Sequence, residues 1–306
     1  MNRNQKQKPL HELTLLDRFL FAEVMDDPEN MEILLEILLE KNVRLEFPTQ
    51  TEKELRRSSL KRFARIDVWA EDENHAIYDT EVQRSNPSNL VKRSRYYQGM
   101  IDSNLLKPGD TDFNKLNPVY IIVIAPFDLF GYGLYRYTFH GQCDEIPELK
   151  LNDDATRIFL NTRGTRDDFV TPELIELLHY IEHTNESNAA SGSVRLRRLQ
   201  DNVRSIQENA EVGVKYMQLW EEFAMERAEA RAEGRSVGLA EGRAEGLVEG
   251  RAEGLKLSLQ SFLNELGTIP EDLQQKIESE TETDTLQTWL KIAFKSKSVS
   301  DFTKQL

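Results

Sequence analysis

Two acidic residues, Asp67 and Glu81, lie in neighbouring stretches of β-branched and aromatic residues, 63–70 and 75–83. The stretches flank a short polar break, residues 71–74, which is typical of a β-hairpin. Aspartate is a poor strand former, so its position calls for a chemical reason. Two carboxylates on adjacent strands repel each other unless a cation joins them, and such hard oxygen ligands suit Mg²⁺ or Mn²⁺. The hairpin therefore predicts a divalent metal site.

The loop of the hairpin decides how the two acids meet. A three-residue loop with Asn74 in the left-handed backbone region would place Asp67 and Glu81 on one side of the sheet, as diagonal neighbours about 7–8 Å apart at the backbone. A metal ion held by these two side chains and the backbone carbonyl of Val82 could lower the pKa of a bound water. Gln83 shares the strand face of Glu81, so it could orient that water.

Basic residues bracket this hairpin, although the net charge of −14 argues against a protein that coats nucleic acid by bulk attraction. Residues 51–65 hold six of them: Lys53, Arg56, Arg57, Lys61, Arg62 and Arg65. Residues 84–95 contain no acid and supply the candidate DNA contacts Arg84, Lys92, Arg93 and Arg95, with Tyr96 beside them. A positive rim around an acidic pocket suits phosphodiester cleavage. Alternatively, the basic residues belong to solvated helix faces, and Tyr96 packs in the core.

The elements that must hold these residues follow from the hydrophobic pattern. Helical spacing predicts helices over residues 10–27, 28–41, 88–106 and 171–183, and β-forming runs predict strands over 118–125, 132–139 and 158–161. The first of these strands is a continuous β-branched run, as in a strand buried on both faces. The order of helices and strands indicates an α/β layer with a mixed sheet.

The second half of the chain is predicted to be helical. Residues 194–233 form a long charged stretch, and a glycine then recurs every four residues from Gly234 to Gly254. Each glycine costs a helix up to about 1 kcal/mol relative to alanine. The tract is therefore either a low-complexity spacer or a self-association helix whose glycine stripe contacts a second helix closely. Residues 257–306 return to ordinary helical patterning.

Other features bound the class of protein. The amino terminus lacks a signal-peptide pattern, and no apolar run approaches the roughly 20 residues that span a bilayer. With Cys143 as the single cysteine, we expect a cytoplasmic protein without disulfides. His179, Glu182 and His183 match the H-x-x-E-H pattern of zinc proteases but have no clear third ligand, so an exposed helix end is the alternative. Glu23 could add an acid near the metal, or belong to a solvated face.

The acidic residues also carry a family resemblance. Asp67, followed after thirteen residues by Glu81-Val82-Gln83, resembles the core of the PD-(D/E)XK nucleases. The segments 15–21, 95–99 and 119–124 and the glycine tract are similar to the recombination-promoting nuclease and transposase-like branch of that superfamily. The resemblance implies a restriction-endonuclease-like mixed sheet flanked by helices. It also implies Asp67 and Glu81 as metal ligands, with Gln83 in place of the motif lysine and Ile66 in place of its proline.

Together these observations predict a Mg²⁺-dependent DNA endonuclease, with Mn²⁺ as a substitute ion, linked to recombination or transposition. The nuclease domain is expected over residues 1–185, a linker and long helix over 186–256, and a small helical domain over 257–306. The alternative is a non-catalytic DNA-binding or assembly protein on a decayed nuclease fold, with the glycine helix as its working part.

Overall fold

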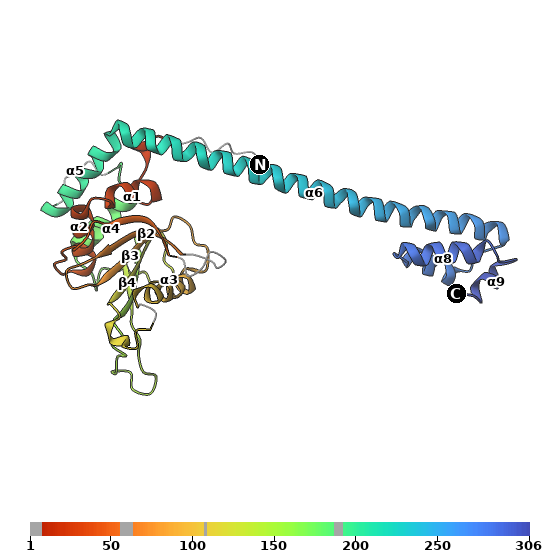
Figure 1. The fold of residues 1–306 in the computed structure, drawn as a ribbon, viewed down its shortest axis with the longest axis horizontal. Helices are drawn as coiled ribbons and strands as arrows, with labels where there is room; N and C mark the ends of the chain where they lie inside the picture. The colour runs from red at the N-terminus through yellow and green to blue at the C-terminus, as the bar shows by residue number, and fades with distance from the viewer. Residues whose placement is uncertain (1–7, 56–63, 107–108, 187–191) are drawn as a thin grey trace. The chain divides into compact units, whose positions relative to one another are not determined.

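Figure 1 shows the fold, a computed structural model that describes residues 8–55, 64–106, 109–186 and 192–306. Arg56, Arg57, Lys61 and Arg62 of the first basic segment lie outside the described residues. Contacts divide the chain into two compact units, Met1–Trp220 and Glu221–Leu306. The three domain ranges expected from the sequence stay predictions.

A six-stranded mixed sheet forms the centre of the first unit (Figure 1). Its strands are β1 (Gln50–Leu55), β2 (Ala64–Glu71), β3 (Ile77–Val82), β4 (Val119–Ala125), β5 (Arg136–Phe139) and β6 (Ala155–Asn161), in the spatial order β1-β2-β3-β4-β6-β5. The pairs β3–β4 and β4–β6 are parallel, and the other three pairs are antiparallel. The β-branched strand β4 lies inside the sheet with parallel neighbours on both sides, as its sequence predicts.

Helices cover both faces of the sheet. The main core joins one face to α1 (Arg18–Met25), α2 (Pro28–Leu39), α4 (Pro172–Glu182) and α5 (Val194–Glu208). The other face packs on α3 (Leu90–Leu105), whose Met100 and Ile101 share one hydrophobic cluster with Trp69 and Ile121 of the sheet. This arrangement confirms the predicted α/β class, a restriction-endonuclease-like mixed sheet flanked by helices.

Two helices differ from their predicted ranges because a residue with extended backbone interrupts each of them. The stretch 10–27 contains a short 3₁₀ helix, Leu10–Glu12, and α1 begins only at Arg18, after Asp17 (φ −84°, ψ 123°). The stretch 194–233 breaks at Asn209 (φ −74°, ψ 121°). The Asn209 Oδ1 accepts hydrogen bonds from the backbone N–H groups of Glu211 and Val212, which are the first turn of α6 (Ala210–Leu266).

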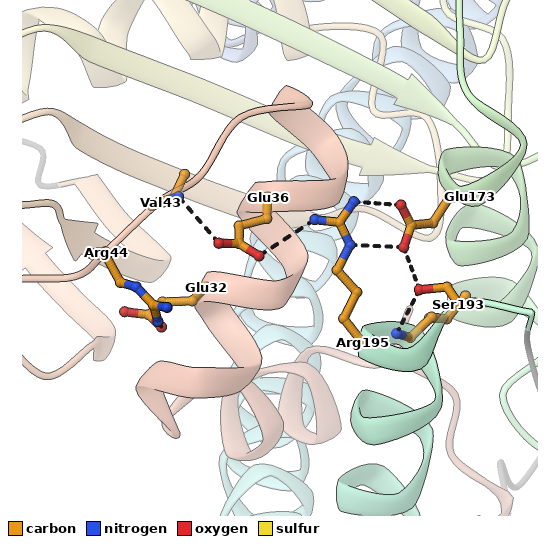
Figure 2. A network of polar contacts seen from close by, with 8 residues as sticks. Glu32, Glu36, Val43, Arg44, Glu173, Ser193 and Arg195 are labelled. Atoms are coloured by element: carbon orange, nitrogen blue, oxygen red, sulfur yellow. Dashed lines mark hydrogen bonds and ion pairs between the residues drawn. The ribbon is translucent and has the colours of Figure 1, made fainter.

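A network of charged groups fastens α5 to the rest of the first unit (Figure 2). The Arg195 guanidinium donates to Glu173 of α4 through Nε (2.8 Å) and reaches Glu36 of α2 at 3.5 Å. Ser193, the N-cap of α5, also donates to Glu173, and the backbone N–H of Val43 donates to Glu36. The neighbouring guanidinium of Arg44 pairs with Glu32 at 2.9 Å. These contacts join α2 to the consecutive helices α4 and α5, which lie far from it in sequence.

The second unit contains a small helical core. Leu259 and Leu263 of α6 pack with residues of α7 (Glu271–Ser279), α8 (Thr283–Ala293) and α9 (Val299–Thr303). Helix α6 stays continuous through the glycine tract and ends before Gly267, whose φ is +147°. None of the helices in the described part of the chain combines the length and apolar character that crossing a bilayer requires.

Candidate active site

The β2–β3 hairpin has a different register from the one predicted. Glu71 pairs with Ile77 and Val68 with Thr80, so the loop is five residues long and the predicted three-residue loop is wrong. Continued by one step, this register sets Asp67 opposite Glu81 rather than diagonal to it.

A buried carboxylate explains the longer loop. The Asp72 carboxylate accepts hydrogen bonds from the backbone N–H groups of Asn74 and Ala76 and from the Tyr78 hydroxyl, at 2.9, 2.9 and 2.7 Å. His75, with φ at +61°, takes the left-handed conformation that was expected for Asn74. The first residue of the loop, Asp72, therefore stabilises the loop conformation through these three hydrogen bonds.

Three acids are buried together at this hairpin. Asp67, Asp79 and Glu81 are 6%, 0% and 4% exposed. The backbone N–H of Val82 donates a hydrogen bond to Asp67, which ties the acid of β2 to the end of β3. Burial raises the pKa of all three carboxyls, and for Glu81 burial together with the charge of Asp67 raises the pKa to about 7. The positive charge near the three carboxyls is therefore too small to stabilise all of them in the ionised form.

Two arginines from different helices contact these acids. Arg18, the first residue of α1, forms an ion pair with Asp67 at 2.6 Å (Nη2 to Oδ1). Arg93 of α3 donates through Nη2 to Glu81 Oε2 at 2.6 Å and to Gln83 Oε1 at 2.9 Å. The structure therefore brings together Asp67, Glu81, Gln83 and one predicted DNA-binding residue, Arg93.

Among the described residues, Arg84, Lys92 and Arg95 form no ion pair with the three buried acids. The Arg84 guanidinium donates to Asp17 at 3.0 Å. Lys92 and Arg95 are exposed on α3, with no ion pair to any residue in the described ranges. Tyr96 is 41% exposed, which disfavours its alternative role in core packing.

The described part of the first basic segment is engaged locally. The Lys53 ammonium lies 3.6 Å from the centre of the Trp69 ring, and Arg65 pairs with Glu52 at 2.7 Å. These two side chains therefore line the β1–β2 edge of the sheet rather than standing free.

The donor set at the hairpin suits a hard divalent cation, since it consists of carboxylate oxygens and an amide. Asp79 gives the clearest sign, because neither of its oxygens has a hydrogen-bond partner among the described residues. The carboxylates do not yet converge, because Asp67 and Glu81 each contact an arginine. In the described part of the chain, one trio of candidate ligand atoms lies within 4.8 Å of one another: Glu46, Glu71 and His75. That trio lies at the opposite end of the hairpin.

Asp79 is the site residue that sequence reasoning missed. It stands two positions before Glu81, so both side chains lie on the α3-facing side of β3, where Ile77 packs in the core. The available signal was an acid within a strand that also contains Ile77, Tyr78 and Val82. Asp79 is unusual because it is fully buried, and its burial depends on α3, which packs on this face of the sheet.

The remaining candidates are engaged elsewhere. Glu182 accepts hydrogen bonds from Thr162 and from the Arg163 guanidinium, so the H-x-x-E-H helix does not turn its acid toward its histidines. Glu23 pairs with Lys215 of α6, and the Cys143 thiol donates to Glu145 at 3.2 Å. None of these contacts supports a second catalytic centre.

Comparison with known proteins gives one match. Residues 16–161 match the family model described as PD-(D/E)XK nuclease family transposase. This range contains all six strands, α1 to α3 and every residue of the buried acidic group. No curated protein and no solved structure matches the chain.

Proposed function

We propose, from the match of residues 16–161 to the PD-(D/E)XK nuclease family transposases, that the chain is a divalent-metal-dependent DNA endonuclease of the cytoplasm, acting in recombination or transposition. The observation that supports the proposal is the burial of three carboxyls, Asp67, Asp79 and Glu81, at one hairpin, where arginines pair with only two of them. A group of this kind destabilises the folded chain unless it binds a cation.

In this proposal Asp67, Glu81 and the Val82 carbonyl hold Mg²⁺, or Mn²⁺ in its place. The chemistry that such a bound ion supplies is activation of water and neutralisation of charge on the phosphodiester. Gln83 orients the attacking water through its amide. Unlike lysine, it brings no positive charge to the transition state, and Arg93, which already contacts Gln83, is the nearest source of that charge.

The DNA backbone would lie along α3 in this proposal. Lys92, Arg93, Arg95 and Tyr96 belong to the first two turns of that helix, and Arg84 precedes it. Phosphate contacts of this type position the duplex without reading its sequence.

Cleavage of supercoiled plasmid tests the proposal. We expect nicking with Mg²⁺, none with a chelator, and none for Asp67→Ala. Asp102→Ala, which removes an acid from the far end of α3, is the matched control and should cleave normally. Purified protein that cuts no DNA under any metal condition would refute the enzymatic role.

The rival function is that of a non-catalytic DNA-binding or assembly protein. The arginine contacts favour it, since Arg18 and Arg93 already neutralise the two principal acids. It predicts salt-dependent DNA binding that is unchanged by Asp67→Ala and Glu81→Ala, with no cleavage.

We further propose that the glycine tract of α6 associates with the same tract of a second copy. Between residues 231 and 254 the four-residue repeat sets Arg231 four positions from Arg235, and it spaces four glutamates by four positions each: Glu241, Glu245, Glu249 and Glu253. Such like-charged pairs destabilise an isolated helix by about 0.2–0.5 kcal/mol each, in addition to the cost of the glycines. Apart from the helix's own neighbouring backbone, no described atom lies within 4 Å of the place that a side-chain Cβ would take at these glycines.

The positions of the charges select a parallel pair. On a helix of 3.6 residues per turn, the glycine stripe has the glutamate row about 100° to one side and the arginine row about 100° to the other. A two-fold axis parallel to the helices then sets the arginine row of each copy beside the glutamate row of its partner, whereas an antiparallel pair would bring like rows together.

Disulfide trapping distinguishes these arrangements in the full chain with Cys143→Ser. In a parallel pair, Gly238→Cys and Gly250→Cys should each form a disulfide with the same position of the other copy. Antiparallel helices would trap at most one of the two. If the full chain sediments as a monomer at micromolar concentration, self-association is refuted and the glycine tract is a spacer.

A further inference from the structure

Asp79 is a buried acid that no contact in the described chain satisfies. It is fully buried, and neither carboxylate oxygen has a hydrogen-bond partner among the described residues. Trp69 stands beside it on β2 and Ile121 on β4. An unpartnered carboxyl among apolar neighbours destabilises the fold, so packing alone does not account for it.

The charged groups around Asp79 all belong to the candidate site. Its carboxyl feels the charges of Glu81 and Asp67, both unfavourable, and that of Arg93, which is favourable. The Arg93 guanidinium, however, donates to Glu81 and Gln83 rather than to Asp79. The charges of the site therefore act on the Asp79 carboxyl, but no side chain of the site donates a hydrogen bond to it.

We propose that Asp79 is a third acidic residue of the metal site, which supplies negative charge to the bound cation from behind Glu81. The inference rests on the proposed metal site and extends it, because the D…E-x-Q pattern contains only Asp67, Glu81 and Gln83. Asp79 is a positioning residue: it strengthens binding of the ion and does not itself touch the scissile phosphate. A purely structural Asp79 would affect folding and leave metal affinity unchanged.

Calorimetric titration of Mn²⁺ into the metal-free full chain, without DNA, tests this role. Asp79→Asn keeps the shape and removes the charge, and we expect Mn²⁺ to bind about 10–100-fold more weakly, the effect typical of residues that support a metal's direct ligands. Asp102→Asn removes a charge from the same domain outside the site and should bind like the wild type. Asp79→Ser is a second variant in case the asparagine does not fold.

Thermal unfolding in a chelator provides the second readout. Because a neutral amide of the same size replaces the buried carboxyl, and neither group has a partner, Asp79→Asn should melt close to or above the wild-type temperature, while gaining less from added Mn²⁺. Weaker metal binding without a loss of metal-free stability is a combination that misfolding does not produce.

The outcomes separate the two proposals. If Asp67→Asn abolishes Mn²⁺ binding while both Asp79 variants bind like the wild type, the role of Asp79 is refuted and the metal site stands. If the wild type binds no Mn²⁺, or Asp67→Asn binds it normally, the metal site itself is refuted and Asp79 with it.

Discussion

Replacing Glu81 with glutamine should make the stability of the metal-free protein less sensitive to pH. Burial raises the pKa of this acid from 4.5 to about 7. An acid whose folded pKa lies above its unfolded value contributes stability that is full below pH 4.5 and is lost as the pH rises through 7. A pKa difference of one corresponds to about 1.4 kcal/mol, so the loss reaches about 3 kcal/mol above pH 7. Glutamine cannot ionise, so the variant does not lose this stability. The free energy of unfolding of Glu81→Gln minus that of the wild type should therefore rise by about 3 kcal/mol between pH 4.5 and a pH above 7.

Urea unfolding in a chelator, from about pH 5 to pH 8, measures this difference. Trp69 lies next to Asp79 in the β2–β3 register, so its fluorescence reports on the site once Trp220 and Trp289 are replaced by phenylalanine. Glu12→Gln removes an exposed carboxylate from the same domain and is the matched control. Parallel pH profiles for Glu81→Gln and the wild type would show that Glu81 is not desolvated, and the reasoning about the site would fail.

Further substitutions test other parts of the structure. Asp72→Ala removes the acceptor of three hydrogen bonds in the β2–β3 loop, and should lower the free energy of unfolding by about 2–4 kcal/mol in urea titrations. Arg195→Met breaks the bridge between α4 and α2; because the guanidinium is partly exposed, we expect a loss of only about 1 kcal/mol by the same measurement. Replacing Lys92 and Arg95 with alanine should weaken binding of a labelled duplex and reduce its salt dependence, as measured by fluorescence anisotropy. Arg84→Ala, whose side chain already pairs with Asp17, should have the smaller effect, and equal effects would contradict binding along α3.

The parts of the fold that sequence reasoning predicted are those set by local pattern. Strand β4 needs β-branched residues because both of its faces are covered, and its run is visible without any structure. Helix α2 carries its own start signal, Asp27 accepting from the backbone of Glu29 with Pro28 at the first position. The acids of the hairpin were found because aspartate in a strand conflicts with local preference.

The parts that were missed depend on contacts between distant residues. The loop of the hairpin is longer than predicted because Asp72 finds the hydroxyl of Tyr78, which no turn statistics contain. Arg93 was predicted from its charge alone, but docking of α3 on the sheet directs it toward Glu81. Asp79 became a candidate only when its complete burial was known.

The hairpin that holds Asp67 and Glu81 also has a consequence for the order of folding. Its strands are joined by a five-residue loop, whereas the parallel pair β3–β4 must wait for the crossover through α3. Local pairings of this kind form early, and long-range ones later. The two acids therefore meet while they are still hydrated, and the free-energy cost of removing their water falls on the late step in which α1 and α3 dock. Folding should thus be slowed by high pH at its end rather than at its beginning.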